Sequence, residues 1–513
     1  MRIKKFLAPF LFPALSGILL VLSFPPFEFH VLAWVALVPL MLSADGSKPA
    51  TSAVGGLVTG VVFLCGSVFW IYNAMHMYGG INPVISVALL MILILYLSLY
   101  FGLFGWFLGR FGGGPGLVVF APPAFVALEY ARGHLLTGFP WELLAHTQYR
   151  IPAMIQICSV TGTAGLTFLI TLVNASVAFY IASMKKGSES RRAAVIPLLA
   201  LLCVAGNVLW GQAQIQRLKS EGGTPFKAAL IQGNIEQDQK WDEKFRQMIA
   251  ERYFEMTLNA SADKPDLILW PEAAAPFLYG KWDPVYTSMM AKVVAGGGAP
   301  VVFGALGRDD AGKKWFNRAY FLAPDGREAK YDKIHLVPFG EYVPLRGILS
   351  FAARLTEAIA GDTEKGTDTT PIKLNGISAG IQICYEIIFP DGSREFALNG
   401  ARIILNITND AWYGRTAASA QHMMSLPFRA VENHLPVLRS ANTGISAFIT
   451  ASGEIKSQTE LYQTVIAKDE VIIPPPRQTF YTRFGDLFTI LILITACVMY
   501  AINPLKPHHS EKS

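Results

Sequence analysis

Three reactive side chains stand at the ends of apolar stretches in the second half of this sequence. They are Glu272 in DLILWPEAAAP, Lys333 in KYDKIHLVPFGEYVP and Cys384 in GIQICYEIIFP. The end of a buried strand opens onto a loop, and loops on a rigid scaffold usually carry catalytic groups. Taken singly, each residue has an ordinary explanation: a helix-capping acid, a solvated lysine and a small buried hydrophobe.

Taken together, the three residue types could carry out nucleophilic catalysis. A cysteine thiol near its free pKa is mostly protonated, so it needs a base or a nearby cation to react. Glu272 could take the proton, and the Lys333 ammonium could stabilise the oxyanion formed by attack on an ester or amide carbonyl. The backbone N–H of Tyr385 would be a second donor to that oxyanion. We therefore predict acyl chemistry through Cys384.

The other cysteines strengthen the case for Cys384. They lie in apolar segments, where a free thiol behaves as a small hydrophobe, and they are Cys65, Cys158, Cys203 and Cys497. Since Cys384 has no partner in the polar part of the chain, we expect no structural disulfide.

The composition indicates a membrane protein. Of 513 residues, 52% are hydrophobic and 16% are charged, and the mean hydropathy is +0.37. Apolar residues cluster before position 212 and again at 484–502, which favours lipid-spanning helices over one very large core. The net charge of +6 lies largely in short loops, so we attribute it to membrane topology and expect no nucleic-acid partner.

We expect three regions: a transmembrane bundle of about seven helices at 1–212, a polar domain at 220–480, and a last membrane helix at 484–502. The predicted spans are roughly 6–24, 28–43, 52–76, 82–109, 115–135, 153–183, 193–212 and 484–502. The first span has the charged start of a secretory signal but no clear cleavage site, so we expect it to remain.

The basic loops predict the orientation. Arg2, Lys48, Arg110 and the Lys185–Arg192 loop fall on one side of the predicted spans, which the positive-inside rule assigns to the cytoplasm. Both termini would then be cytoplasmic, and residues 213–483 would lie outside. Segment 131–150 falls on that same outer side, as a connecting loop or an interfacial element.

The polar region reads as a layered α/β domain. A helical pattern, WDEKFRQMIAERYFEMTLNA, follows the first strand pattern, FKAALIQGNI. Further strands are expected in DLILW, PVVFGAL, AYFLA, ISAGIQI, ARIILNI, LPVLRSAN, GISAFIT and VIAKDEVII.

The segments WPEAA, YDKIHLVPFGEYVP and ICYEIIFP resemble the Glu-Lys-Cys signature of the nitrilase, or carbon–nitrogen hydrolase, superfamily. That resemblance implies an αββα sandwich for about residues 220–480. With TGFPW, NDAWYG and the flanking spans, the whole chain is similar to the bacterial apolipoprotein N-acyltransferase family. The expected fold is thus an α-helical transmembrane bundle of about eight spans with an extramembrane nitrilase-like sandwich.

The resemblance also implies roles for particular residues. Glu272 would be the base, Lys333 the oxyanion stabiliser and Cys384 the nucleophile. Glu341 would be a supporting carboxylate; its ordinary role would be a surface or capping acid. The three residues expected to shape the substrate pocket are Tyr385, Glu386 and Trp412, although Trp412 could equally be a core tryptophan.

The implied reaction moves an acyl chain from a membrane phospholipid, of the phosphatidylethanolamine kind, to an apolipoprotein. The acceptor is the free α-amine of a diacylglyceryl-modified N-terminal cysteine. No metal or cofactor is implied, and we expect a monomer in the bacterial inner membrane with its catalytic domain on the periplasmic side. The apolar segment 345–360 is either an amphipathic lid that enters the bilayer or a helix packed on the sandwich.

Three other functions fit parts of the sequence. A membrane-tethered amidase or nitrilase would use water as acceptor on a lipid-like or small amide, but it would not need so many spans. A Cys–His hydrolase based on His335 would leave Glu272 and Lys333 without roles. A transporter with an appended sensor domain is disfavoured because intramembrane charges are sparse, with Glu129 and Arg132 as the main exceptions.

Overall fold

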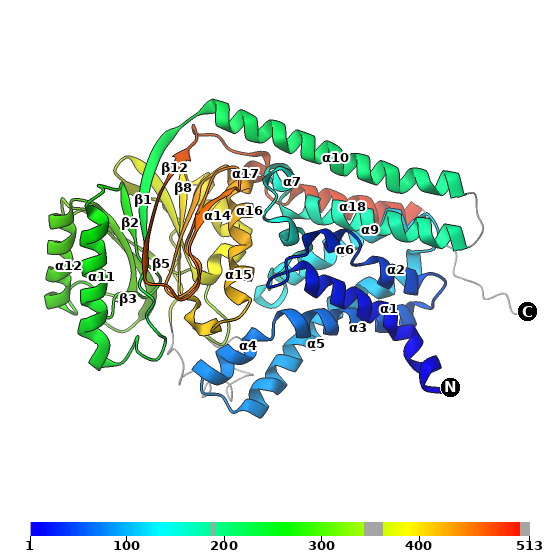
Figure 1. The fold of residues 1–513 in the computed structure, drawn as a ribbon, viewed down its shortest axis with the longest axis horizontal. Coiled ribbons are helices and arrows are strands. Elements are labelled where there is room, and N and C mark those ends of the chain that lie inside the picture. Colours follow the sequence, from blue (N-terminus) through cyan, green and yellow to red (C-terminus); the bar gives the residue numbers. More distant parts are fainter. Residues whose placement is uncertain (1, 186–189, 343–362, 503–513) are drawn as a thin grey trace, which may run out of the picture.

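Long apolar helices build the half of the molecule that contains both ends of the chain (Figure 1). The computed structural model describes residues 2–185, 190–342 and 363–502. Within these residues, four helices are long and apolar enough to cross a membrane: α3 (Pro49–Ser67), α5 (Pro83–Phe111), α9 (Thr163–Lys185) and most of α10 (Ser190–Glu221). Shorter or less apolar helices pack with them in the bundle: α1 (Arg2–Ser23), α2 (Val38–Ala44), α6 (Gly116–His134) and α18 (Leu487–Ile502).

Three of the predicted spans differ from the structure. Helix α3 ends at Ser67 within the predicted span 52–76, and α4 (Trp70–Asn73) and a π-helical turn (Ala74–Tyr78) follow it. The stretch 28–43 is not one helix: a 3₁₀ turn at His30–Trp34 precedes α2, whose seven residues extend only about 10 Å, against a hydrocarbon core of about 30 Å. The predicted span 153–183 begins instead with two single-turn helices, α7 (Pro152–Ile155) and α8 (Cys158–Thr161). Gly162, with a φ of 61°, separates them from α9.

Two six-stranded sheets form the other half, in the orders β12-β1-β2-β3-β4-β5 and β11-β10-β9-β8-β7-β6. The first sheet contains β1 (Thr224–Gln232), β2 (Leu267–Leu269), β3 (Val301–Arg308), β4 (Trp315–Leu322), β5 (Glu328–Asp332) and β12 (Val465–Ile473). The second contains β6 (Ile372–Leu374), β7 (Ile377–Ile383), β8 (Ile403–Thr408), β9 (Val437–Ala441), β10 (Ala447–Ile449) and β11 (Ile455–Gln458).

Helices cover both sheets, which gives the expected αββα layers. The outer layer is α11 (Arg246–Ser261) and α12 (Pro284–Gly297), and the inner layer is α14 (Pro390–Leu398), α15 (Ala418–Met423) and α16 (Ser425–Asn433) (Figure 1). The predicted helix 241–260 begins late because Asp242 instead caps a 3₁₀ turn, Glu243–Phe245.

The strands that the sequence did not predict are β5, β6 and β11, and all three lie at or next to an open end of a sheet order. Edge strands are short and carry polar residues, so they lack a continuous apolar run. Lys333 therefore follows the polar strand EAKYD and not the apolar strand that the sequence suggested.

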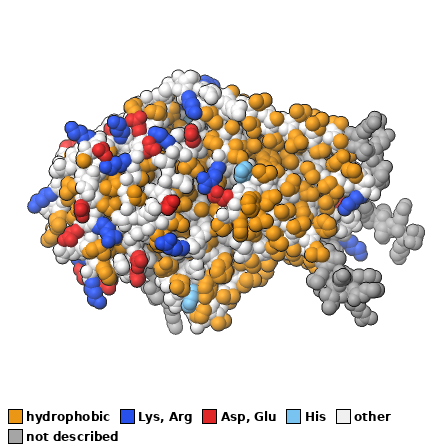
Figure 2. Space-filling view, viewed as in Figure 1, with side chains coloured by type: hydrophobic (Ala, Val, Ile, Leu, Met, Phe, Trp, Pro, Cys, Tyr) orange, Lys and Arg blue, Asp and Glu red, His pale blue; other side chains and the backbone are white. Residues whose placement is uncertain are grey.

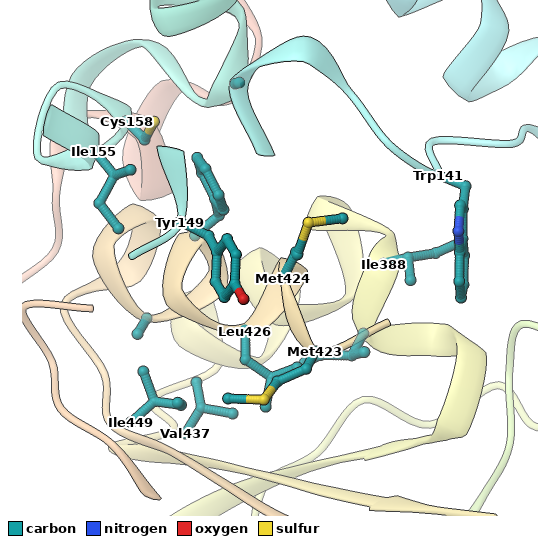
Figure 3. Close-up of a cluster of buried hydrophobic side chains, with 14 of the residues drawn as sticks. Trp141, Tyr149, Ile155, Cys158, Ile388, Met423, Met424, Leu426, Val437 and Ile449 are labelled. Atoms are coloured by element: carbon teal, nitrogen blue, oxygen red, sulfur yellow. The ribbon is translucent and has the colours of Figure 1, made fainter. Parts of the chain in front are cut away.

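One hydrophobic core joins the bundle to the sandwich. Trp141, Tyr149, Ile155 and Cys158 from the bundle side pack toward Met423, Met424 and Leu426 at the α15–α16 corner (Figure 3). Segment 131–150 is therefore part of this junction and not a plain loop. The outer surface divides in the same way: hydrophobic side chains cover the bundle, and charged side chains cover the sandwich (Figure 2).

Candidate active site

The three predicted catalytic residues come from loops at the ends of separate strands. Glu272 lies shortly after β2, Lys333 directly after β5, and Cys384 directly after β7. All three are buried: Glu272 is 8% exposed, Lys333 1% and Cys384 7%. The two sheets face each other, so residues more than a hundred positions apart meet in one site.

Lys333 lies between two carboxylates. Its Nζ is 3.5 Å from Oε1 of Glu272, and it lies 3.0 and 2.9 Å from Oε1 and Oε2 of Glu341. A buried ammonium would be costly alone, and these two carboxylates compensate its charge. Burial alone would lower the pKa of Lys333, but Glu341 and then Glu272 raise it above its ordinary value, so the side chain is a permanent cation.

Asn317 and Asn409 fix the carboxylate of Glu272. The Nδ2 of Asn317 donates to Oε1 of Glu272 at 2.7 Å and to Oε1 of Glu341 at 2.8 Å. The backbone N–H of Asn409 donates to Oε2 of Glu272 at 2.9 Å. Gly304 of β3 makes room for this loop, because a Cβ there would lie 2.4 Å from the backbone nitrogen of Ala273.

The chain turns sharply at Cys384. Its φ is 55°, in the left-handed region that a non-glycine residue rarely occupies at a cost of about 1–3 kcal/mol. Strand β7 ends there and a 3₁₀ turn, Cys384–Ile388, begins. The strained residue thus lies at the end of a rigid strand, where the charges of Glu272 and Lys333 act on its thiol.

Glu386 holds this turn to the loop of Lys333. Its carboxylate accepts hydrogen bonds from the backbone N–H groups of Ile383, Ile334 and His335, and from the hydroxyl of Tyr331. Burial raises the pKa of Glu386 to about 7, although these donors oppose the shift. Glu386 thus joins the turn at Cys384 to the loop of Lys333 by hydrogen bonds. It also lines a cavity of about 330 Å³ whose lining includes none of Glu272, Lys333 and Cys384.

The surroundings of Cys384 favour the protonated form of its thiol. Burial and then Glu272 raise the pKa of Cys384, while Lys333 and a hydrogen bond with Thr408 oppose them. A thiol in this state needs a base at the moment of attack, and the Glu272 carboxylate is close enough for its charge to act on the sulfur.

The remaining predicted residues have different surroundings. Tyr385 is buried and its ring meets Phe389 edge-on, with centroids 5.1 Å apart. Trp412 is half-buried at the junction, where its ring meets Tyr78 of the bundle at 6.2 Å. His335 stacks on Phe389 with centroids 3.7 Å apart, and within the described chain no hydrogen bond joins its ring to Cys384. That placement does not support His335 as the base.

Several polar residues of the site were not predicted. Lys240 is buried, and its Nζ donates to the backbone carbonyl of Glu272 at 3.0 Å. Burial lowers the pKa of Lys240 to about 8, against the attraction of Glu272 and Cys384. The others are Asn317, Asn409, Asp410, Gln421, His422 and Arg439. Asn317 and Arg439 could have been identified from the sequence, because each is a polar residue within an apolar strand pattern.

Known protein families match both halves of the chain. The family described as apolipoprotein N-acyltransferase N-terminal domain matches residues 16–176, and carbon–nitrogen hydrolase matches residues 227–469. An apolipoprotein N-acyltransferase of Geobacter metallireducens is 39% identical over 506 residues, 96% of this chain and 95% of that one. A Haemophilus influenzae protein of the same name is 30% identical over 508 residues, covering 96% and 95%.

Among solved structures, an amidase from Nesterenkonia sp. has a TM-score of 0.39 and 19% sequence identity, over 53% of this chain and 97% of that one. The identity to the curated relatives, in contrast, extends over 96% of the chain. With nearly the whole of each relative matched, this chain belongs to the apolipoprotein N-acyltransferase family.

Proposed function

We propose that this N-acyltransferase works through an acyl thioester on Cys384, with Glu272 as the base and Lys333 as the oxyanion stabiliser. The observation that carries the proposal is the Lys333 ammonium, buried between Glu272 at 3.5 Å and Glu341 at 2.9 Å, beside a buried thiol. A fixed cation, a carboxylate and a thiol are the groups that acyl transfer through sulfur requires.

In the first half-reaction, Glu272 takes the thiol proton as the sulfur of Cys384 attacks an ester carbonyl of a phospholipid. The carbonyl π electrons move to oxygen, and Lys333 and the N–H of Tyr385 stabilise the resulting oxyanion. Collapse breaks the ester C–O bond. The leaving glycerol oxygen takes the proton from Glu272, so a lysophospholipid departs and the thioester remains.

In the second half-reaction, the neutral α-amine of the diacylglyceryl cysteine of an apolipoprotein attacks the thioester. Glu272 accepts the proton that the nitrogen loses, the C–S bond breaks, and the proton returns to the sulfur. The products are an amide and the free thiol. Because one site serves both halves, the enzyme is expected to follow ping-pong kinetics.

The supporting residues have separate roles in this proposal. Glu341 keeps Lys333 charged and in place, which its bonds at 2.9 and 3.0 Å support. Tyr385 and Glu386 shape the turn that carries the nucleophile. Trp412, facing Tyr78 of the bundle at 6.2 Å, forms the wall where an acyl chain would enter from the membrane side.

We place the protein in the bacterial inner membrane, with the sandwich on the periplasmic side and both termini in the cytoplasm. The start of α1 and the end of α18 lie at the end of the bundle far from the sandwich, which supports this orientation (Figure 1). A phosphatidylethanolamine-like phospholipid is the proposed donor. The apolar face of the bundle continues to the sandwich, which supports a donor that carries acyl chains (Figure 2).

The proposal is tested by incubating the purified protein with a phospholipid labelled in its acyl chain. Wild type should form a hydroxylamine-labile adduct that maps to Cys384. Cys384→Ala should form none, whereas Cys158→Ala, which removes another buried thiol, should still form it. An adduct on the Cys384→Ala variant would refute the mechanism.

The acceptor is tested by chasing the labelled protein with a diacylglyceryl peptide that has a free N-terminus. The peptide should discharge the label as an amide much faster than water discharges it as a fatty acid. Equal discharge by water would instead indicate a lipid hydrolase.

A further inference from the structure

The side chain of Gln421 joins the sandwich to three segments of the bundle. Its Oε1 accepts hydrogen bonds from the indole N–H groups of Trp70 and Trp141, both at 2.9 Å. Its Nε2 donates to the backbone carbonyls of Ser67 at 3.0 Å and Pro25 at 3.4 Å. Gln421 is 3% exposed, so a buried amide has all four hydrogen-bonding positions filled by the bundle.

The next residue, His422, contacts the nucleophile. Its Nε2 lies 3.2 Å from the backbone carbonyl oxygen of Cys384, and its ring is wholly buried. Its Nδ1 lies 3.1 Å from Oδ1 of Asp410 and 3.1 Å from Nη2 of Arg439, which also binds Oδ2 of Asp410 at 2.7 Å. Burial lowers the pKa of His422, which favours a neutral ring. The ring therefore joins two groups: Nε2 meets the Cys384 carbonyl, and Nδ1 meets the Asp410–Arg439 pair.

The carbonyl that His422 holds belongs to the strained residue. Cys384 has a φ of 55°, and such a conformation persists only where neighbours over-determine it. Asn406 donates to the same carbonyl at 3.4 Å, and Glu386 fixes the next turn. His422 differs from these two because its helix, α15, is held from the other side by the bundle.

We propose that Gln421 and His422 are positioning residues through which the membrane bundle sets the orientation of the Cys384 nucleophile. The bundle orients the amide of Gln421, and the short helix α15 passes that orientation to His422 and so to the Cys384 carbonyl. The packing supports a rigid connection, because the Trp141 ring lies 5.5 Å from that of His422 and the Met423 and Met424 side chains fill the junction (Figure 3).

The chain offers a matched control for this connection. Gln156 is also a fully buried glutamine of the junction, and its Nε2 donates across it to the carbonyl of Ser452 at 2.8 Å. It lies in the turn between α7 and α8, and its hydrogen bonds lead to Pro152 and Ser452 and not to the catalytic turn. Gln421→Met and Gln156→Met therefore both remove hydrogen bonds at the junction. Of the two, Gln421→Met is the variant that alters the support of Cys384.

The experiment rests on the proposed function, since it measures the first-turnover rate of label transfer from phospholipid to Cys384 in the full-length protein. We expect Gln421→Met to lower the rate at saturating lipid by about tenfold or more, because small misplacements of a nucleophile have effects of that size. The lipid concentration for half-saturation should not change. Gln156→Met should keep the rate within about twofold of wild type while lowering the melting temperature.

A second pair of variants covers the case in which Gln421→Met does not fold. Trp70→Phe removes one donor to Gln421 but keeps a ring, and Trp34→Phe removes an indole donor elsewhere in the bundle, to Gln148. The inference predicts a slower first turnover for Trp70→Phe than for Trp34→Phe. It is overturned if the members of each pair behave alike, or if Gln421→Met folds and reacts normally. A wild-type adduct at a residue other than Cys384 would overturn the proposed function, and this inference with it.

Discussion

At the scale of single residues, the site holds two lysines in different electrostatic states. Lys333 has two carboxylate partners and stays charged. The Lys240 ammonium has only the backbone carbonyl of Glu272 as a hydrogen-bond acceptor among the described contacts, and burial lowers its pKa to about 8. Lys240 is therefore the lysine whose charge changes within a range where the protein can be assayed.

We predict that Lys240→Met lowers the rate of Cys384 acylation by about tenfold at pH 7, the factor that about 1.4 kcal/mol of charge stabilisation gives. Below about pH 8 the wild-type ammonium stabilises the negative charge that develops at the sulfur and the oxyanion. Above that pH the lysine loses its proton, so the wild-type rate should fall toward that of the variant.

The measurement is the ratio of wild-type to variant first-turnover rates across a pH series from neutral to alkaline. The control is Lys244→Met, an exposed lysine of the same loop, for which the ratio should remain near one. A Lys240→Met ratio that does not change with pH would show that the charge of Lys240 has no part in acylation.

At the scale of elements, the bundle depends on glycines that let α3 and α5 approach closely. A Cβ at Gly56 would lie 2.0 Å from the carbonyl oxygen of Phe101, and one at Gly105 would lie 2.1 Å from that of Ser52. Because the neighbouring atoms are backbone, neither helix can yield by moving a side chain. Close contact between backbones replaces the hydrophobic effect as a source of attraction between helices in lipid.

Gly56→Ala should therefore lower the free energy of unfolding by about 1–3 kcal/mol, the usual cost of overpacking. Gly206→Ala is the matched change on α10, where an added Cβ would meet no atom within 4 Å, and it should be neutral or slightly stabilising. Thermal unfolding of the purified protein in detergent compares the two. Equal melting temperatures would mean that α3 and α5 can separate without loss.

At the scale of the whole molecule, the charged sandwich and the α2–α3 loop of the bundle lie at opposite ends (Figure 1). The α2–α3 loop containing Lys48 lies near the far end of the bundle, while α10 runs toward the sandwich and leads into β1 (Figure 1). In the orientation proposed above, the two ends face different compartments, which can be tested in living cells.

We predict that a reporter enzyme that needs disulfides for activity will be active when fused after Gly222 or Gly80, and inactive when fused after Lys48. Such enzymes fold only in oxidising compartments outside the cytoplasm. Comparing reporter activity with the amount of each fusion protein gives the result. Reporter activity for the fusion after Lys48 and none for the fusion after Gly222 would show that the orientation is the opposite of the one proposed.

The sequence by itself determined the class of chemistry and the kind of fold. Glu272 and Cys384 could be predicted because each is a reactive residue type after an apolar strand pattern, and Lys333 because YDKIHLVPFGEYVP resembles a family motif. Their catalytic roles stay predictions. The apolar runs of α3, α5 and α9 are local signals too, so membrane helices could be predicted. The predicted lid at 345–360 lies outside the described residues.

Only the tertiary structure decided which groups surround the reactive three. Gln421 meets Trp70 across 351 positions of sequence, and Asn409 meets Glu272 across 137. Neither contact leaves a periodic pattern, because each depends on how two sheets and a bundle pack and not on the conformation of either segment. Edge strand β5 was missed because of its local sequence: its polar residues face water, so the strand has no apolar pattern. Residue type thus fixed what the site can do, and long-range packing fixed how its groups are held.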